Sequence, residues 1–124
     1  MLDVYELINT LLSNLGVEVF NEYIPLNKPF PYIKFYCPSI GNGESLRKDI
    51  LLYVDIWDKN TDIINVESIS NEVDLRLNRA NFINNTMQIS IYRDSIWRLN
   101  IPDSDLETRR RQLRYVVKII KIGE

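Results

Sequence analysis

The sequence predicts an α+β fold: a single domain over residues 1–124, with a mostly antiparallel β-sheet, two helices packed on one face and a long protruding β-hairpin. Two segments show the apolar spacing of a helix, and most of the remaining chain alternates apolar and polar residues as strands do. The 124 residues contain no repeat and no linker, and this length is typical of one domain. Packing the helices against one sheet is the economical arrangement of such elements.

The two helices are predicted over residues 3–15 and 61–79. The first has apolar side chains at helical spacing, at Val4, Leu7, Ile8, Leu11, Leu12 and Leu15. The second places apolar side chains on one face at Ile63, Val66, Val73 and Leu77. Asp3 with Glu6 resembles a capping box at the start of the first helix, and Gly16 suits its end. Each helix therefore has one apolar face to bury.

Strands are predicted over residues 17–20, 32–37, 46–57, 87–92, 96–101 and 109–122, with a turn at residues 93–95. Gly41-Asn42-Gly43 is a turn signal between the second and third strands. The third strand would reach about 40 Å at about 3.3 Å per residue, which is long for a small domain. These two strands are therefore expected to form a hairpin whose tip projects beyond the core.

The last strand combines an apolar face with a basic one. Alternation places Leu113, Tyr115, Val117 and Ile119 towards the core, whereas Arg109, Arg110, Arg111 and Arg114 are expected mainly at the surface. From Arg109 onward six cationic residues stand against one acidic residue, a balance of +5. The preceding chain carries −7, because the net charge is −2. Such a subunit can meet complementary patches on its neighbours.

The residue types of common catalytic sites are missing. The chain has no histidine and one cysteine, which excludes His-based zinc sites, Ser-His-Asp triads and an internal disulfide. Cys37 ends an apolar strand, which favours a buried and inert thiol. Asp103 and Asp105 lack the pattern of a calcium loop, and Gly41-Asn42-Gly43 lacks the frame of a phosphate loop. The sequence therefore predicts no enzyme, cofactor or metal.

Membrane association is also not expected. No stretch approaches the roughly 20 apolar residues that a transmembrane helix needs. The N-terminus lacks a basic segment followed by an apolar one, as a secretory signal would have. We expect a soluble protein that is made in the cytosol.

The order of several short segments resembles a known family, the tail-completion or tail-terminator proteins of long-tailed bacteriophages. The segments that carry the resemblance are the helix Val4–Leu12, Val17-Glu18-Val19-Phe20, Pro29-Phe30-Pro31-Tyr32-Ile33, Val54-Asp55-Ile56-Trp57, the helix Thr61–Leu77 and the closing Tyr115-Val116-Val117. No single segment is specific, since each is a short structural pattern. Their order, spacing and total length together carry the resemblance.

The resemblance implies a structural virion protein that forms a hexameric ring at the head-proximal end of the tail tube. Such a ring stops tube polymerisation and joins the tail to the head connector. The implied partners are further copies of the chain, the tail tube protein and the connector or neck protein. DNA would pass through the lumen without specific recognition. The implied location is the phage tail or neck, with assembly in the host cytoplasm. The family has no catalytic residues to carry over.

Two regions are the candidate ring or partner interface, namely the expected hairpin tip and the basic run. Their residues are Ser39, Ile40, Asn42, Glu44, Arg47, Arg109, Arg110, Arg111 and Arg114. A closed ring needs unlike patches that fit each other, and the charge asymmetry provides such patches.

Two alternatives remain open from the sequence. One is another neck or tail component, such as a head-tail adaptor or a tail tube protein. The other is a nucleic-acid-binding regulator that uses the C-terminal arginines. Nucleic-acid-binding domains usually have an isoelectric point above about 9. The value here is about 5.2, which argues against the second alternative.

Overall fold

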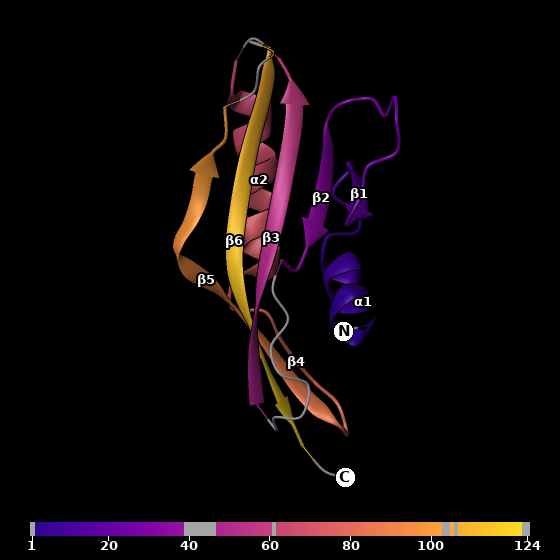
Figure 1. The fold of residues 1–124 in the computed structure, drawn as a ribbon, viewed down its shortest axis with the longest axis vertical. Coiled ribbons are helices and arrows are strands. Elements are labelled where there is room, and N and C mark those ends of the chain that lie inside the picture. Colours follow the sequence, from indigo (N-terminus) through magenta and orange to yellow (C-terminus); the bar gives the residue numbers. More distant parts are fainter. Residues whose placement is uncertain (1, 39–46, 61, 103–104, 106, 123–124) are drawn as a thin grey trace.

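The computed structural model describes residues 2–38, 47–60, 62–102, 105 and 107–122. These residues form one α+β domain, as the sequence predicts, with two helices and one six-stranded sheet (Figure 1). The elements in chain order are α1 (Leu2–Leu11), β1 (Glu18–Asn21), β2 (Tyr32–Tyr36), β3 (Arg47–Lys59), α2 (Ile64–Leu77), β4 (Asn81–Ile83), β5 (Met87–Asn100) and β6 (Thr108–Lys121).

The sheet is mixed, with the strand order β1-β2-β3-β6-β5-β4. In the described part of the chain, β1 and β2 pair in parallel and the other neighbouring pairs are antiparallel. The two long strands β3 and β6 lie at its centre and pair along their whole length, from Arg47 opposite Ile120 to Lys59 opposite Thr108. This long register aligns the two alternating sequences, so that each face of the sheet receives one set of side chains from both strands.

The core lies between this sheet and the helices. On the covered face, β3 and β6 bury the apolar residues that alternation predicts, namely Ile50, Leu52, Val54, Ile56, Leu113, Tyr115, Val117 and Ile119. The helices bury Val4, Ile8, Leu12, Val66, Val73 and Leu77 against them. In Figure 1, α2 lies behind β3 and β6, and α1 lies beside β1 and β2. The opposite face of the sheet therefore carries no helix in the described part of the chain.

The long protruding hairpin is not confirmed. The two strands predicted for it do pair, but only over the five residue pairs between Tyr32–Trp57 and Tyr36–Tyr53. Among the described residues, the remainder of β3 pairs with β6 and with no other strand. Its predicted tip, including Gly41-Asn42-Gly43, lies outside the described residues. The length of β3 therefore serves its pairing with β6.

The helices and β5 differ in extent from their predictions. Helix α1 ends at Leu11 rather than at residue 15, and Asn14 and Gly16 adopt positive φ angles of 63° and 76°. The Arg76 guanidinium of α2 donates a 3.3 Å hydrogen bond to the carbonyl of Leu11, so a partner distant in sequence satisfies this helix end. The turn predicted at residues 93–95 is instead part of β5, which runs continuously with an irregular register between Arg93 and Arg98. A turn signal within a strand can therefore mark a bulge.

Candidate functional site

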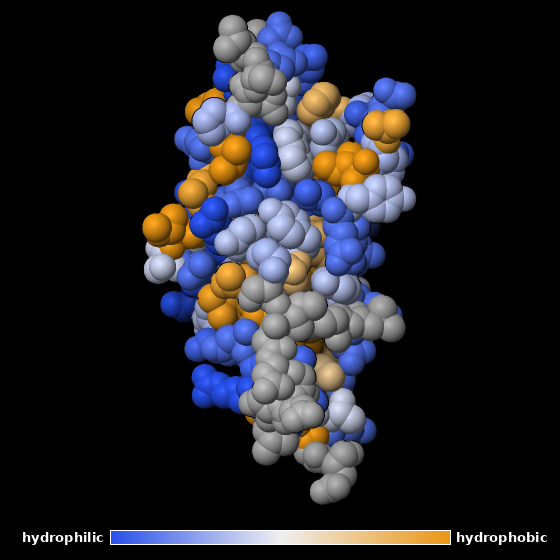
Figure 2. Space-filling model, viewed as in Figure 1, coloured by the Kyte–Doolittle hydropathy of each residue, from blue (hydrophilic) through white to orange (hydrophobic). Residues whose placement is uncertain are grey.

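The uncovered side of the sheet gathers an ordered set of aromatic, cationic and polar side chains. The registers of β2, β3 and β6 arrange nine of them in three rows, which we call the open face: Tyr32, Trp57 and Arg110; Lys34, Asp55 and Gln112; Tyr36, Tyr53 and Arg114. This side of the sheet faces the viewer in Figure 1, and pale and blue side chains fill its middle in Figure 2. All nine side chains come from positions that alternate with the buried core positions of the same strands.

Each cation of the open face lies over an aromatic ring. The Arg110 guanidinium is 4.7 Å from the centroid of Trp57, and that of Arg114 is 4.7 Å from the centroid of Tyr53. The Lys34 ammonium is 4.7 Å from the centroid of Tyr36. Cation–π contacts of this kind fix the long side chains against the rings, so the face is ordered before any partner binds.

Asp55 occupies the centre of the open face and is fully buried beneath its neighbours. The Arg110 guanidinium donates a 3.1 Å hydrogen bond to one carboxylate oxygen, and the Gln112 amide donates a 2.9 Å bond to the other. Arg114 then donates a 2.8 Å bond to the Gln112 carbonyl oxygen. A buried carboxylate is tolerated only when charges and hydrogen bonds compensate it. Arg110 and Gln112 provide that compensation directly, and Arg114 holds Gln112 in place.

Tyr36 borders this buried charge. Burial is the main cause that raises the pKa of the Tyr36 hydroxyl, and the Asp55 charge raises it further. Arg110 and Arg114 act in the opposite direction but are weaker causes. Tyr36 is therefore neutral at neutral pH and contributes an uncharged hydroxyl to the face.

The aromatic surface extends to the edge of the sheet. Phe30 stacks on Tyr32 with ring centroids 5.1 Å apart, and Tyr32 contacts Trp57 at 5.4 Å. At the other end of β6, Lys118 lies 5.6 Å from the ring centroid of Tyr92 in a shallow groove. The open face is thus the middle of a larger surface that is rich in rings and cations.

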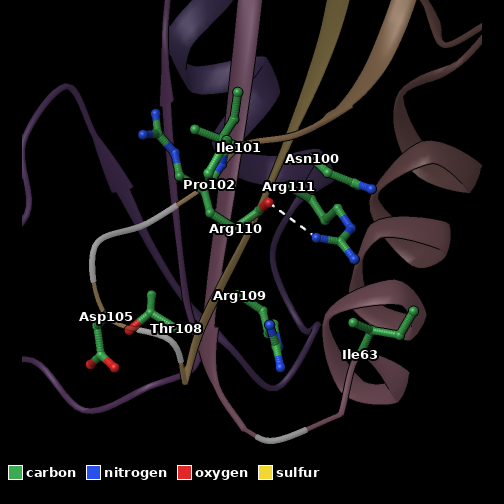
Figure 3. Close-up of a pocket in the computed structure, with 9 residues that line it drawn as sticks. All are labelled: Ile63, Asn100, Ile101, Pro102, Asp105, Thr108, Arg109, Arg110 and Arg111. Carbon is green, nitrogen blue, oxygen red and sulfur yellow. Dashed lines mark hydrogen bonds between the residues drawn. The ribbon is translucent and has the colours of Figure 1, made fainter.

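The predicted basic run divides between the two faces of the sheet. Arg110 and Arg114 belong to the open face, whereas Arg109 and Arg111 lie on the covered face, where Arg111 points towards α2 (Figure 3). The prediction that these arginines lie mainly at the surface is wrong for Arg111, which is only 6% exposed. Its guanidinium donates a hydrogen bond to the Glu67 carboxylate on α2. The reason is alternation, since neighbouring residues of a strand point to opposite faces.

Helix α2 supplies carboxylates to several arginines on the covered side. Glu67 accepts hydrogen bonds from Arg98 as well as from Arg111. Asp74 accepts from Arg93 and, at 2.9 Å, from the buried hydroxyl of Tyr115. Burial and the Asp74 charge raise the pKa of Tyr115, so this hydroxyl keeps its proton and remains a donor. This network stabilises the contact between helix α2 and the sheet, because its side chains form hydrogen bonds with one another.

The other predicted interface residues divide into two groups. Ser39, Ile40, Asn42 and Glu44 lie outside the described residues. Arg47 is the exposed first residue of β3 and pairs in register with Ile120, at the far end of the sheet from Arg110. The structure therefore does not bring Arg47 together with the basic run.

Sequence reasoning missed most of the open face. Trp57 and Asp55 were noted only within a segment of the family resemblance, and neither they nor Lys34 and Gln112 were assigned to any site. A signal was present, because the polar and aromatic positions of the two central strands alternate with their aliphatic ones. The missing information was the register, which sets Asp55 opposite Gln112 and Trp57 opposite Arg110.

No protein-family model matches the chain, and no curated protein matches it in sequence. Among the described residues, no three His, Cys, Asp or Glu side chains are placed to hold a metal ion together. No helix in that part of the chain is long and apolar enough to cross a membrane. The candidate site is the open face, whose exposed groups are aromatic rings and cations.

Proposed function

We propose that this chain is a structural, non-enzymatic virion protein of a long-tailed bacteriophage, a tail terminator or tail-completion subunit. In this proposal copies of the chain form a ring, with six as the expected number, at the head-proximal end of the tail tube. The ring stops tube polymerisation and joins the tail to the connector or neck protein. Assembly takes place in the host cytoplasm, and DNA passes through the lumen without specific recognition.

The open face is the observation that best supports this proposal. Tyr, Trp, Phe and Arg are the residue types enriched in the cores of protein–protein interfaces. The open face holds three tyrosines, a tryptophan and two arginines around Asp55, and Phe30 extends it by stacking on Tyr32. These side chains are already ordered by ring stacking and hydrogen bonds, which lowers the entropic cost of binding a partner. The resemblance to the tail-terminator family supplies the context of a ring.

The proposal is tested by the size and shape of the purified protein. Light scattering or native mass spectrometry should give a closed oligomer, either alone or after mixing with tail tubes. Negative-stain images should then show discrete rings at one end of each tube. Monomers alone, even with tubes present, would contradict the proposal. Open stacks would favour a tail tube protein, and rings that bind only the connector would favour a head-tail adaptor.

Binding to single-stranded nucleic acid is a second candidate function, because proteins also bind single strands with aromatic side chains and cations. The open face is a poor match for it in one respect. Its Tyr53 and Trp57 rings are stacked against arginines of the same chain, and bases would have to displace them. Salt-dependent binding of a labelled oligonucleotide that is lost in Trp57→Ala would favour this candidate instead.

A further inference from the structure

The edge of the molecule formed by α1 and the end of β1 carries an acidic surface. Asp3, Glu6 and Glu22 are exposed there, and the Tyr5 hydroxyl donates a 3.3 Å hydrogen bond to Glu22. Tyr23 follows Glu22 and is 72% exposed. We call Asp3, Glu6, Glu22 and Tyr23 the acidic edge. It combines negative charge with a large exposed ring, a residue type that often dominates binding energy.

The open face has the opposite charge. Its three cations, Lys34, Arg110 and Arg114, outnumber its single carboxylate, and that carboxylate is fully buried. Positive charge therefore reaches the surface of the open face while the negative charge does not. The open face and the acidic edge are complementary in sign, and complementary potentials favour specific pairing of surfaces.

The two surfaces belong to different parts of one chain. Helix α1 packs with α2 and the covered face, through Val4 and Ile8 in the common core. The open face is the opposite side of the sheet. Two unlike surfaces on different sides of a subunit give a head-to-tail contact, which closes into a ring or continues as a filament.

We infer that the open face of one copy binds the acidic edge of the next copy, with Lys34 and Arg114 facing the carboxylates of Glu6 and Glu22. This inference rests on the proposed ring and names the two surfaces that close it. The contact is electrostatic at its rim, so added salt weakens it.

Charge-swapped variants test this pairing. A face variant carries Lys34→Glu and Arg114→Glu, and an edge variant carries Glu6→Lys and Glu22→Lys. Each variant alone brings like charges together at every contact, and its apparent association constant should fall at least tenfold. Mixed in equal amounts, the two variants should assemble again, because a ring of alternating copies then restores opposite charges at every contact.

The controls keep the outcomes separate. Arg79→Glu makes the same type of charge change at an exposed residue outside both surfaces, and it should assemble like the wild type. Melting temperatures check folding. If the face variant unfolds, the milder pair Lys34→Gln with Arg114→Gln should still weaken assembly on its own, and the mixing test is then not applied to it. If the wild-type protein forms rings, two results would contradict the pairing of the open face with the acidic edge. One is normal assembly of either variant alone, and the other is no assembly of the mixed face and edge variants. Wild-type protein that forms no ring would contradict the proposed function itself.

Discussion

The two faces of β3 and β6 are made by the same two strands and differ in almost every property. Over most of its length the covered face holds aliphatic side chains and Tyr115, nearly all fully buried under the helices, with Arg111 buried towards one end. The open face holds half-exposed aromatic rings and cations around one buried carboxylate and one buried amide. The difference indicates a division of roles. The covered face accounts for the stability of the fold, and the open face is available for partners.

Truncation on the covered face should have the largest effect. Leu113 is fully buried, so Leu113→Ala should lower the free energy of unfolding by about 2–5 kcal/mol. Leu51 lies on the opposite side of the sheet and is half-exposed, and Leu51→Ala should cost less than half as much. Urea denaturation of both variants measures the difference. Equal losses would show that the open side also belongs to the core.

The arginines provide the next comparison. Arg111 is buried against Glu67, so Arg111→Met should destabilise the fold by about 1–3 kcal/mol. Arg98 also pairs with Glu67 and limits this loss. Arg114→Met on the open face should cost no more than about 1 kcal/mol. Thermal melts test the order of the two variants, and a larger loss for Arg114 would reverse the assignment of faces.

The buried carboxylate of the open face can be examined through Tyr36. Burial is the main cause of the raised pKa of Tyr36, and the Asp55 charge is the second cause. Asp55→Asn should therefore lower this pKa while leaving it above the ordinary value. Ultraviolet titration that follows the Tyr36 signal, assigned with Tyr36→Phe, measures the shift. An unchanged pKa would mean that Asp55 carries no charge near this hydroxyl.

Cys37 gives the smallest and simplest comparison, because it lies next to the covered core. Burial, followed by the charge of Glu22, raises the pKa of its thiol to about 11. The thiolate is the reactive form. Alkylation by iodoacetamide at pH 9 should therefore be at least tenfold slower in the folded protein than in urea. Similar rates would place the thiol in an exposed, unperturbed site.

The fold class was predictable because the determining patterns are local. Helical spacing located both helices, and alternation located the central strands and the correct core residues, such as Leu113 and Val117. The ends of α1 and the continuity of β5 were not predictable in this way. They depend on tertiary contacts, such as that of Arg76 with the carbonyl of Leu11.

The candidate site was predictable only in part, and for the same reason. The basic run was visible, but its division between two faces follows from strand geometry, and the partner of Arg111 lies on α2, 44 residues earlier. Replacing both Arg110 and Arg111 with Glu would therefore disturb the core and the open face at once. Lys34 and Gln112 lie in the site because of the register in which the strands pair, and no local sequence pattern specifies that register.

Oxidative footprinting of the free and assembled protein tests the central claim most directly. Tyr53 and Trp57 of the open face should become several-fold less reactive towards hydroxyl radicals when copies assemble. Leu75 on α2, which is 76% exposed and belongs to neither surface, should keep its reactivity. Rings in which Tyr53 and Trp57 react as readily as in the free subunit would contradict the assignment of the open face as the assembly surface.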